Sequence, residues 1–366
     1  MSVMVAKLGS SSLVDGDGGI RDELIDARLR DLERLRRLGH RPVLVSSGAI
    51  ACGYRHLGFR ERPTALPDLQ AASAVGQGVL FRRYQELCAP LGITPAQVLL
   101  TSADLERRAG YLNARNTLMR LLELGVLPII NENDTTATDE LTFGDNDVLA
   151  AHVAVLLGAT WLVLLTDRDG LYGVGADGQP ELIGTLAAGV GPYDVTLADM
   201  RGSGLGRGGV ESKLASAGMA TAAGITTVIA GASREGVLAA VASGQHVGTR
   251  FRPAPRRMSA FKLWLRYAKP AMGRVVVDAG AARALRVKGT SLLPVGVVHA
   301  DGTFLAGDAV EVVDDRGAPV GKGIAGMSAD ECRMVAGMRS EAVVDLIKDG
   351  PMELIHRDEF VLHDAT

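Results

Sequence analysis

The segments VMVA (Val3–Ala6), DELIDARLRDLERLRRL (Asp22–Leu38) and PVLV (Pro42–Val45) decide the fold, because they begin a pattern that recurs along most of the chain. The two short segments are rich in valine, as buried strands are, whereas the long segment spaces its apolar residues three and four apart, as a helix does. Gly39 is a natural stop for that helix. A strand, a helix and a second strand in succession predict two parallel strands joined by a crossover helix.

The same alternation continues well beyond this first unit. Further strands are expected at Gln97–Leu100, Val126–Ile130, Trp161–Leu165 and Thr226–Ala230, and helices at Leu112–Leu124, Asn146–Leu157 and Glu211–Ala223. Strands and helices that alternate in this way are typical of parallel sheets with helices on both faces. We therefore predict an α/β fold whose mostly parallel sheet is sandwiched by helices.

The composition changes near residue 250, which indicates a second domain. Residues 250–274 contain eight basic residues, three prolines and no acidic residue. After them come short strand-like pieces separated by turn signals. We predict an α/β domain at residues 1–251, a basic linker at 252–272 and a small β-rich domain at 273–355.

The overall composition excludes several classes of protein. The chain has 366 residues, 47% apolar and 22% charged, and a formal net charge of −3, so it is neither disordered nor basic throughout. Cys52, Cys88 and Cys332 lie far apart and predict neither a zinc site nor disulfides, which suits the cytoplasm. The N-terminus does not resemble a signal peptide. The uncharged stretch Val148–Thr166 is interrupted by Gly158, so we expect a buried helix and strand there rather than a membrane span.

Two small-residue motifs follow the first two strands. Lys7–Ser12 (KLGSSS) combines a lysine with a glycine, which lets a ligand approach the backbone closely, and exposed N–H groups there can hold an anion. Ser46–Ile50 (SSGAI) opens the next helix, whose free N–H groups favour a carboxylate or phosphate. An ordinary turn and simple capping by Ser47 are the alternatives at these positions.

Polar residues gather after three later segments of the chain. Asn131–Asp134 (NEND) and Gly144–Asp147 (GDND) carry more carboxyl and amide groups than helix capping requires. Such groups hold Mg²⁺, orient lysines or bind an ammonium group. Thr166–Tyr172 (TDRDGLY) is either a loop at the same sheet edge or a surface turn. His152, within an apolar helix, is expected to be a core residue.

A glycine-rich loop, Gly202–Gly209, leads into a helix that bears Lys213. Its glycines match GxGxxG, but no strand precedes the loop, so a dinucleotide-binding turn is rejected. A Walker A loop is also absent, because Lys213 does not directly follow the last glycine. A loop that faces phosphate and a disordered linker remain as the two interpretations.

Taken in order, six motifs resemble the amino acid kinase family over residues 3–250. They are KLGSS, VSSGAIACG, INENDTTAT, FGDNDVLAA, LLTDRDGLY and SGLGRGGVESK. The fragments GTSLLPVGV and FLAGDAVEVVD in the later segment resemble a PUA domain. The closest resemblance is to the members that use ATP to phosphorylate the side-chain carboxylate of L-glutamate on the route to proline. It implies ATP and Mg²⁺ as cofactors, with Mg²⁺ bridging the phosphates and no metal site built from protein side chains.

The resemblance also implies roles for particular residues. Lys7 and Lys213 would stabilise the transferring phosphoryl group, and Asp147 would orient both lysines. The implied glutamate-binding residues are Ser47, Asp134, Asp145 and Asn146. The implied nucleotide-binding residues are Lys7, Gly9, Thr166, Asp167, Arg207, Gly208, Gly209, Val210, Glu211, Ser212 and Lys213. The sequence departs from the family pattern in the last of these segments, where Arg207 and Ser212 stand in place of threonines and Val210 in place of methionine.

Alternatives to this function stay open at the level of sequence. Another member of the same fold would act on aspartate, acetylglutamate, carbamate or UMP. An RNA-binding PUA protein with an inert kinase domain is a third reading, but residues 273–350 hold nine Lys/Arg against eleven Asp/Glu, a poor footprint for nucleic acid. The family also implies proline as a competitive inhibitor and self-association as a dimer or tetramer, without contact with a membrane.

Overall fold

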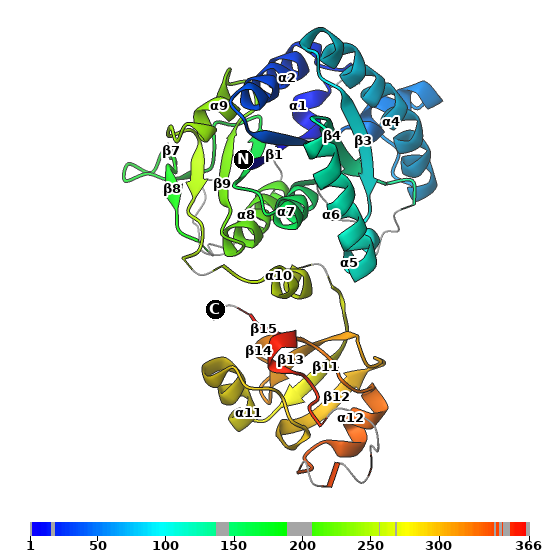
Figure 1. Ribbon diagram of the computed structural model, residues 1–366, viewed down its shortest axis with the longest axis vertical. Coiled ribbons are helices and arrows are strands. Elements are labelled where there is room, and N and C mark those ends of the chain that lie inside the picture. The colour runs from blue at the N-terminus through cyan, green and yellow to red at the C-terminus, as the bar shows by residue number, and fades with distance from the viewer. Residues whose placement is uncertain are drawn as a thin grey trace. The chain divides into compact units, whose positions relative to one another are not determined.

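The computed structural model forms two compact units, residues Met1–Met258 and Ser259–Thr366 (Figure 1). Each unit has its own sheet and its own hydrophobic core. The residues that the structure describes are 2–15, 19–136, 146–188, 207–255, 257–267, 269–339, 342–343, 346 and 352–363.

The first unit is built on an eight-stranded sheet of order β3-β4-β2-β1-β5-β9-β10-β8. The strands are β1 Val3–Leu8, β2 Arg41–Ser46, β3 Pro95–Leu100, β4 Leu127–Glu132, β5 Trp161–Thr166, β8 Thr185–Leu186, β9 Thr226–Gly231 and β10 Thr249–Phe251. From β3 to β9 all neighbours are parallel, and β10 then runs antiparallel to β9. The predicted α/β fold with a mostly parallel sheet is confirmed.

Helices cover both faces of this sheet (Figure 1). One face carries α2 Asp22–Arg37, α4 Leu66–Cys88 and α9 Val237–Ala242, and the other carries α6 Arg108–Glu123, α7 Asn146–Leu157 and α8 Arg207–Ala222. Side chains of a strand alternate between the two faces. In β1, Met4, Ala6 and Leu8 pack into the core beneath α2 and α9, so Lys7 lies on the face of α7 and α8.

The periodic segments fold as their patterns predict. Helix α2 buries Ile25, Leu29, Leu32 and Leu35 along one stripe. Acidic residues in its first turn and basic residues in its last turn interact favourably with the helix dipole. The chain leaves this helix at Gly39, whose φ of +83° suits glycine. Helix α7 has the predicted bounds, and the buried His152 lies within it.

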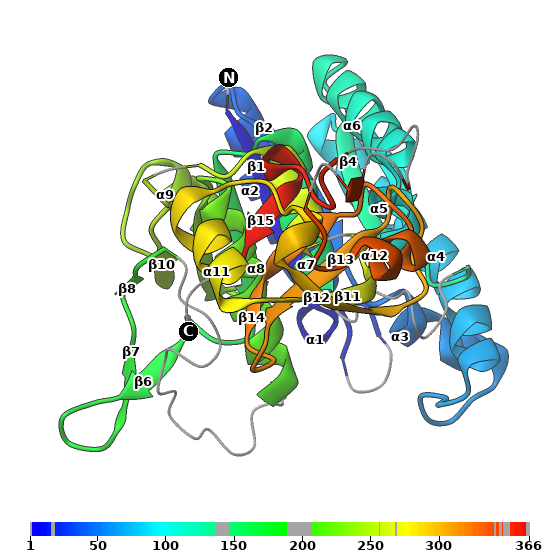
Figure 2. The same cartoon turned by 90° about the horizontal axis from the view of Figure 1, so that it is seen from below.

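Other elements carry weak sequence signals, and their bounds emerge only in the structure. Helix α4 has 23 residues and crosses the short helix α3 Ala49–Gly53, where Gly53 and Gly76 bring the two backbones together. Short strands β6 Tyr172–Val174 and β7 Pro180–Leu182 form a hairpin that extends from the body of the unit (Figure 2). The remaining elements of the unit are α1 Ser10–Leu13, η1 Tyr54–Leu57, η2 Ala89–Leu91 and α5 Ser102–Glu106.

The second unit is built on a five-stranded sheet of order β12-β11-β13-β14-β15. Its elements are α10 Ala260–Tyr267, β11 Ala271–Val277, α11 Ala279–Arg283, η3 Ala284–Lys288, η4 Pro294–Gly296, β12 Val297–Gly302, β13 Ala309–Asp314, β14 Pro319–Ile324, α12 Ala329–Val335, η5 Arg357–Glu359 and β15 Phe360–Leu362. Strands β11 and β13 are parallel and the other neighbours antiparallel, around a core of Val275, Val310 and Val312. Helix α10 and the start of β11 lie within the segment 252–272 that we expected to be a linker.

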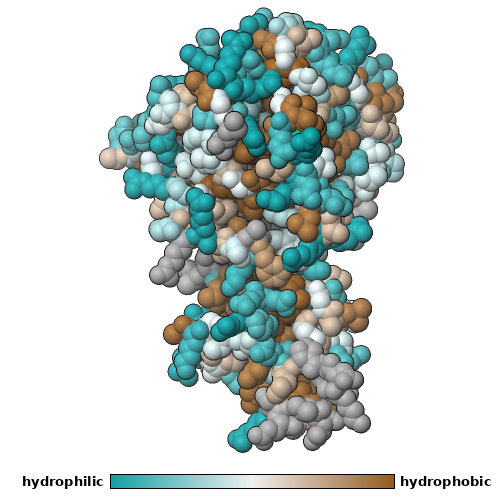
Figure 3. Space-filling model, in the orientation of Figure 1, coloured by the Kyte–Doolittle hydropathy of each residue, from teal (hydrophilic) through white to brown (hydrophobic). Residues whose placement is uncertain are grey.

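Many apolar residues of both units are buried in these cores, while others such as Leu38 and Val287 are exposed. On the face shown in Figure 3, hydrophilic side chains predominate over the first unit and hydrophobic ones form small separate groups. The uncharged stretch Val148–Thr166 is divided between α7 and the buried strand β5, as predicted. Within the described parts of the chain, no helix is both long and apolar enough to span a membrane. Cys52, Cys88 and Cys332 are free and buried.

Candidate active site

A buried cluster of two lysines and one aspartate lies between the sheet and the helices α7 and α8. The Nζ atom of Lys7, in β1, lies 2.8 Å from Oδ1 of Asp147, and the Nζ atom of Lys213 lies 2.7 Å from Oδ2. Asp147 belongs to the first turn of α7 and Lys213 to the N-terminal part of α8. The three residues are 4%, 0% and 6% exposed. The structure thus brings together the three residues that were assigned catalytic roles.

The cluster carries one more positive than negative charge, and this excess shapes what it can bind. Each oxygen of Asp147 faces one ammonium group, so the carboxylate fixes the positions of both lysines. Buried charges that are paired in this way stay in place without water. Because two cations share one anion, the cluster attracts a further anion, and a phosphoryl group in transfer is such an anion.

Gly9 keeps the approach to Lys7 open. A Cβ atom at this position would lie 3.7 Å from Nζ of Lys7 and 3.9 Å from the carbonyl oxygen of Leu165. A larger side chain would extend from there across the ammonium group, whereas glycine leaves the space free. The φ of Gly9 is −76°, which other residues adopt easily, so space rather than backbone conformation explains the glycine.

Asn146 connects the lysine cluster to the polar residues that follow β2 and β4. It directly precedes Asp147, and its Nδ2 group lies 2.8 Å from the Ser46 carbonyl oxygen, 2.9 Å from Ser47 Oγ and 2.7 Å from Asn131 Oδ1. These contacts hold the ends of β2 and β4 and the start of α7 together at one edge of the sheet. Among the described residues, the buried atoms Oδ1 of Asn146 and Nδ2 of Asn131 have no hydrogen-bond partner. A bound polar ligand would satisfy both atoms.

Helix α4 supports the residues at the end of β4. Ser73 Oγ donates a 2.8 Å hydrogen bond to Oδ2 of Asp134, and Gln77 Nε2 donates a 3.2 Å bond to the Glu132 carbonyl oxygen. Burial raises the pKa of Asp134, while the bond from Ser73 and the charge of Arg62 act in the opposite direction. The carboxylate of Asp134 would therefore gain from a cationic partner, such as the ammonium group of an amino acid.

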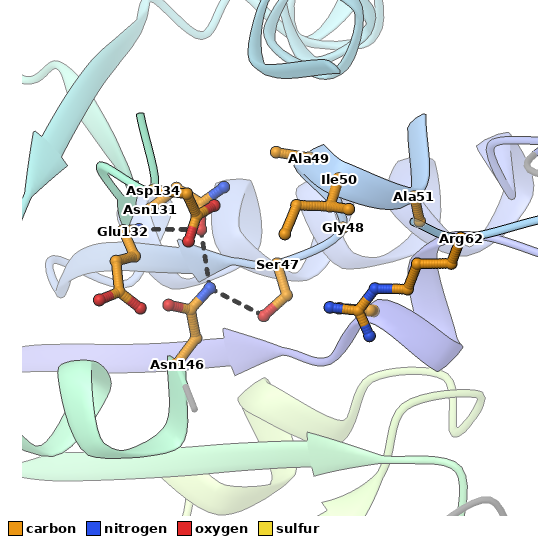
Figure 4. Close-up of a pocket in the computed structure, with 11 residues that line it drawn as sticks. Ser47, Gly48, Ala49, Ile50, Ala51, Arg62, Asn131, Glu132, Asp134 and Asn146 are labelled. Atoms are coloured by element: carbon orange, nitrogen blue, oxygen red, sulfur yellow. Dashed lines mark hydrogen bonds between the residues drawn. The ribbon is translucent and has the colours of Figure 1, made fainter. Parts of the chain in front are cut away.

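These residues line a pocket of about 250 Å³, which suits a small molecule rather than a large one (Figure 4). Glu132, Asp134, Asn131 and Asn146 lie on one side of Ser47, and the side chain of Arg62 lies on the other. The lining residues are Ser10, Ser47, Gly48, Ala49, Ile50, Ala51, Arg62, Asn131, Glu132, Asp134 and Asn146. Gly48 has a φ of +96°, a backbone conformation that favours glycine, at the turn from β2 into α3.

The other site residues proposed from the sequence lie in two nearby segments. Thr166 ends β5, next to β1, and its Oγ1 donates a 2.9 Å hydrogen bond to Oδ1 of the exposed Asp167. The segment Arg207–Lys213 forms the start of α8, so Gly208, Gly209, Val210, Glu211 and Ser212 lie on the helix that carries Lys213. Asp145 and the loop residues Gly202–Gly206 lie outside the described residues.

Several residues around the pocket were not selected from the sequence. Arg62, Ser73 and Gln77 belong to a loop and a helix without a recognisable motif, and tertiary packing alone places them here. Asn131 and Glu132 belong to the NEND motif, of which the family resemblance implies a binding role for Asp134 alone. The Tyr84 hydroxyl, 2.9 Å from Ser46 Oγ, adds a buried contact behind the pocket, and burial raises its pKa.

Comparison with known proteins places the two units in known families. The amino acid kinase family matches residues 2–231, and the PUA domain matches residues 273–347. The chain belongs to the amino acid kinase family. Within that family it groups with the glutamate 5-kinases, which it matches over nearly its whole length.

Three relatives show how close this grouping is. The glutamate 5-kinase of Synechococcus sp. (strain JA-3-3Ab) is 43% identical over 365 residues, covering 99% of this chain and 98% of that protein. The glutamate 5-kinases of Gloeobacter violaceus and Burkholderia mallei are also 43% identical, over 370 and 364 residues, covering 99% and 98% of this chain and 99% and 97% of theirs. A UMP kinase structure from Bacillus anthracis aligns with 69% of this chain and 96% of that chain at 13% identity and a TM-score of 0.45, too weak a likeness to support a conclusion.

Proposed function

We propose that this chain transfers the γ-phosphoryl group of ATP to the side-chain carboxylate of L-glutamate, the first step of proline biosynthesis. The observation that carries the proposal is the adjacency of the Lys7–Asp147–Lys213 cluster to a small pocket lined by carboxylates and amides. Relatives named glutamate 5-kinase match the chain from end to end. This agreement favours glutamate over aspartate, acetylglutamate, carbamate or UMP.

The chemistry needs positioning and charge stabilisation rather than a general base. At pH 7 the side-chain carboxylate of glutamate is already ionised, so no proton has to be removed. One of its oxygens forms a bond to the γ-phosphorus while the bond to the bridging oxygen breaks, giving glutamyl 5-phosphate and ADP. Negative charge spreads over the transferring phosphoryl oxygens. Lys7 and Lys213, fixed by Asp147, would stabilise that charge from two sides.

Different pocket residues can bind the two ends of glutamate, the side-chain carboxylate and the α-ammonium group. Asn146 and Ser47 adjoin the cluster, so we place the reacting carboxylate of glutamate beside them. Asp134, whose pKa is raised by burial, would receive the α-ammonium group. Asp145 belongs to the same proposed set by sequence. Binding both ends of a flexible amino acid would fix the reacting carboxylate for attack.

ATP is proposed to bind at the opposite side of the cluster, along Gly9, Thr166, Asp167 and the segment Arg207–Lys213. Both oxygens of Asp147 face ammonium groups, and the described residues include no group of three His, Cys, Asp or Glu side chains arranged to hold a metal ion. A Mg²⁺ ion would therefore enter the site with the phosphates of ATP. When bound, the ion supplies positive charge to the phosphates.

The test is to trap the acyl phosphate with hydroxylamine in the presence of ATP and Mg²⁺. L-Glutamate, L-aspartate and N-acetylglutamate are assayed side by side, with ADP release measured in parallel. We expect γ-glutamyl hydroxamate from L-glutamate, and little product from the other two acids. Product from another acid alone would overturn the substrate assignment, and no product from any acid would overturn the proposed activity.

We also propose that proline, the end product of the pathway, competes with glutamate for the pocket. Proline carries the same α-carboxylate and ammonium groups as glutamate, so the residues that bind those groups would accept it. Millimolar proline should raise the apparent KM for L-glutamate and leave kcat unchanged. Inhibition that lowers kcat at saturating glutamate, or no inhibition, would contradict competition.

Two further inferences follow from family membership. We propose that the chain assembles as a dimer or tetramer, which light scattering coupled to size-exclusion chromatography would test. A single monomer peak at assay concentration would contradict it. We also propose a cytoplasmic location, which the free, buried cysteines support.

A further inference from the structure

Arg62 brings a positive charge to a pocket whose other charged residues are acidic. It lies in the segment between η1 and α4, and its side chain reaches the pocket on the side of Ser47 opposite to Glu132 and Asp134 (Figure 4). Of the described residues that line the pocket, it is the one cation. No hydrogen bond or ion pair joins Arg62 to any other described residue, so its guanidinium N–H donors can bind a ligand.

The charges of L-glutamate leave one group without a partner in the proposed site. The side-chain carboxylate faces the lysine cluster, and the ammonium group faces Asp134. The α-carboxylate remains, and neither Glu132 nor Asp134 can receive it, because like charges repel. Arginine binds carboxylates through two parallel N–H donors, which gives the pair a defined geometry.

We propose that Arg62 is a specificity-determining residue that binds the α-carboxylate of the substrate. This assignment rests on the proposed function. The loop position of Arg62 agrees with it, because an exposed side chain at the pocket mouth can fold over a bound molecule without disturbing the core. Arg62 then selects free α-amino acids over analogues whose α-carboxylate is neutral.

A second effect of Arg62 must be separated from this one. Burial raises the pKa of Asp134, and the charge of Arg62 offsets part of that rise. Loss of Arg62 therefore also changes the affinity of Asp134 for an ammonium group. A substrate that keeps the ammonium group and the side-chain carboxylate but has a neutral α-carboxamide distinguishes the two effects. L-Isoglutamine has that structure.

The experiment compares kcat/KM for L-glutamate and L-isoglutamine in the full-length wild type and in Arg62→Ala. The wild type should prefer L-glutamate by about tenfold or more, the effect expected of one charged hydrogen-bonding group. Arg62→Ala should lower kcat/KM for L-glutamate by about tenfold more than it lowers kcat/KM for L-isoglutamine, because only L-glutamate loses the contact with its α-carboxylate, while the effect through Asp134 acts on both substrates. Arg62→Lys, which keeps the charge but not the paired donors, should fall between the two.

The matched control is Arg60→Ala, since Arg60 is exposed in the same loop but does not line the pocket. It should behave as the wild type with both substrates. Equal losses for both substrates in Arg62→Ala, or no loss with L-glutamate, would overturn the assignment of Arg62 alone. A wild-type chain that yields no hydroxamate from L-glutamate would overturn the proposed function, and this assignment with it.

Discussion

The lysine cluster and the pocket beside it differ in how their polar groups are satisfied. In the cluster, Lys7, Asp147 and Lys213 satisfy one another through contacts of 2.8 and 2.7 Å deep under α7 and α8. In the pocket, buried atoms of Asn131 and Asn146 lack partners within the described residues, and burial raises the pKa of Asp134. Two adjacent regions of one sheet edge thus have opposite character.

This difference suggests a division of labour in phosphoryl transfer. Groups that stabilise a transition state are most effective when they are already in position, because no reorganisation is then needed. Groups that bind a substrate must keep donors and acceptors free for it. The cluster has the first property and the pocket has the second. Substitutions in the cluster should therefore lower kcat, and substitutions around the pocket should raise the KM for glutamate.

The largest effect is expected from Lys213→Ala. It removes one of the two cations beside the transferring phosphoryl group, and kcat should fall by about 1000-fold while the KM for L-glutamate changes little. Initial rates at varied glutamate and ATP give both constants. Asp147 keeps its contact with Lys7, so the fold should persist, as a thermal melt would show. A kcat close to that of the wild type would remove Lys213 from the mechanism.

A second prediction concerns the wall of the pocket. Gly76 of α4 lies against the Ala49 backbone of α3, and a Cβ atom at residue 76 would overlap the Ala49 carbonyl group. Gly76→Ala should therefore force the helices apart and lower the free energy of unfolding by about 3 kcal/mol. Because Ala49, Ile50 and Ala51 line the pocket, the KM for L-glutamate should rise while the KM for ATP stays the same.

Gly78 offers a matched control in the same helix. It is exposed, and a Cβ atom there would meet nothing within 4 Å. Gly78→Ala should therefore raise the free energy of unfolding by about 0.5–1 kcal/mol, the ordinary helix preference for alanine. Denaturant titrations of both variants measure the difference. Equal effects of the two substitutions would contradict a tight crossing of α3 and α4.

Much of the fold could be predicted from local patterns. Buried parallel strands are continuous apolar runs, and α2 and α7 carry clear helical or apolar signals, so their positions followed from the chain alone. The pattern does not predict helix α4, because its buried face includes the small or polar residues Ala72, Ser73, Gly76 and Gln77, and it packs against α3 through glycine. The short strand β8 pairs with β10, which lies far along the chain. Local patterns do not encode such contacts.

The site residues also fall into a group that the sequence predicts and a group that only tertiary packing reveals. Lys7, Asp147 and Lys213 are far apart in sequence, and family resemblance rather than spacing suggested that they meet; the structure places them in contact. Arg62 and Ser73 carried no signal, because a lone arginine in a loop and a serine in a helix are common everywhere. Tertiary packing alone brings Arg62 to the lining of the pocket and Ser73 to Asp134. Their roles stay predictions for experiment.

The smallest predicted effect concerns the support of Asp134 by α4. The 2.8 Å bond from Ser73 Oγ favours the ionised carboxylate, so Ser73→Ala should raise the pKa of Asp134 further above its usual range. Only the ionised form attracts the ammonium group of glutamate. The KM for L-glutamate should therefore rise as pH falls, and in Ser73→Ala this rise should begin at higher pH, reaching about threefold over the wild type. Asp134→Asn, which lacks the titrating group, should show a raised KM without this pH dependence. If KM followed the same pH profile in Ser73→Ala as in the wild type, Asp134 would not be the acceptor of the ammonium group. Glu132, the other acid that lines the pocket, would then be the alternative acceptor.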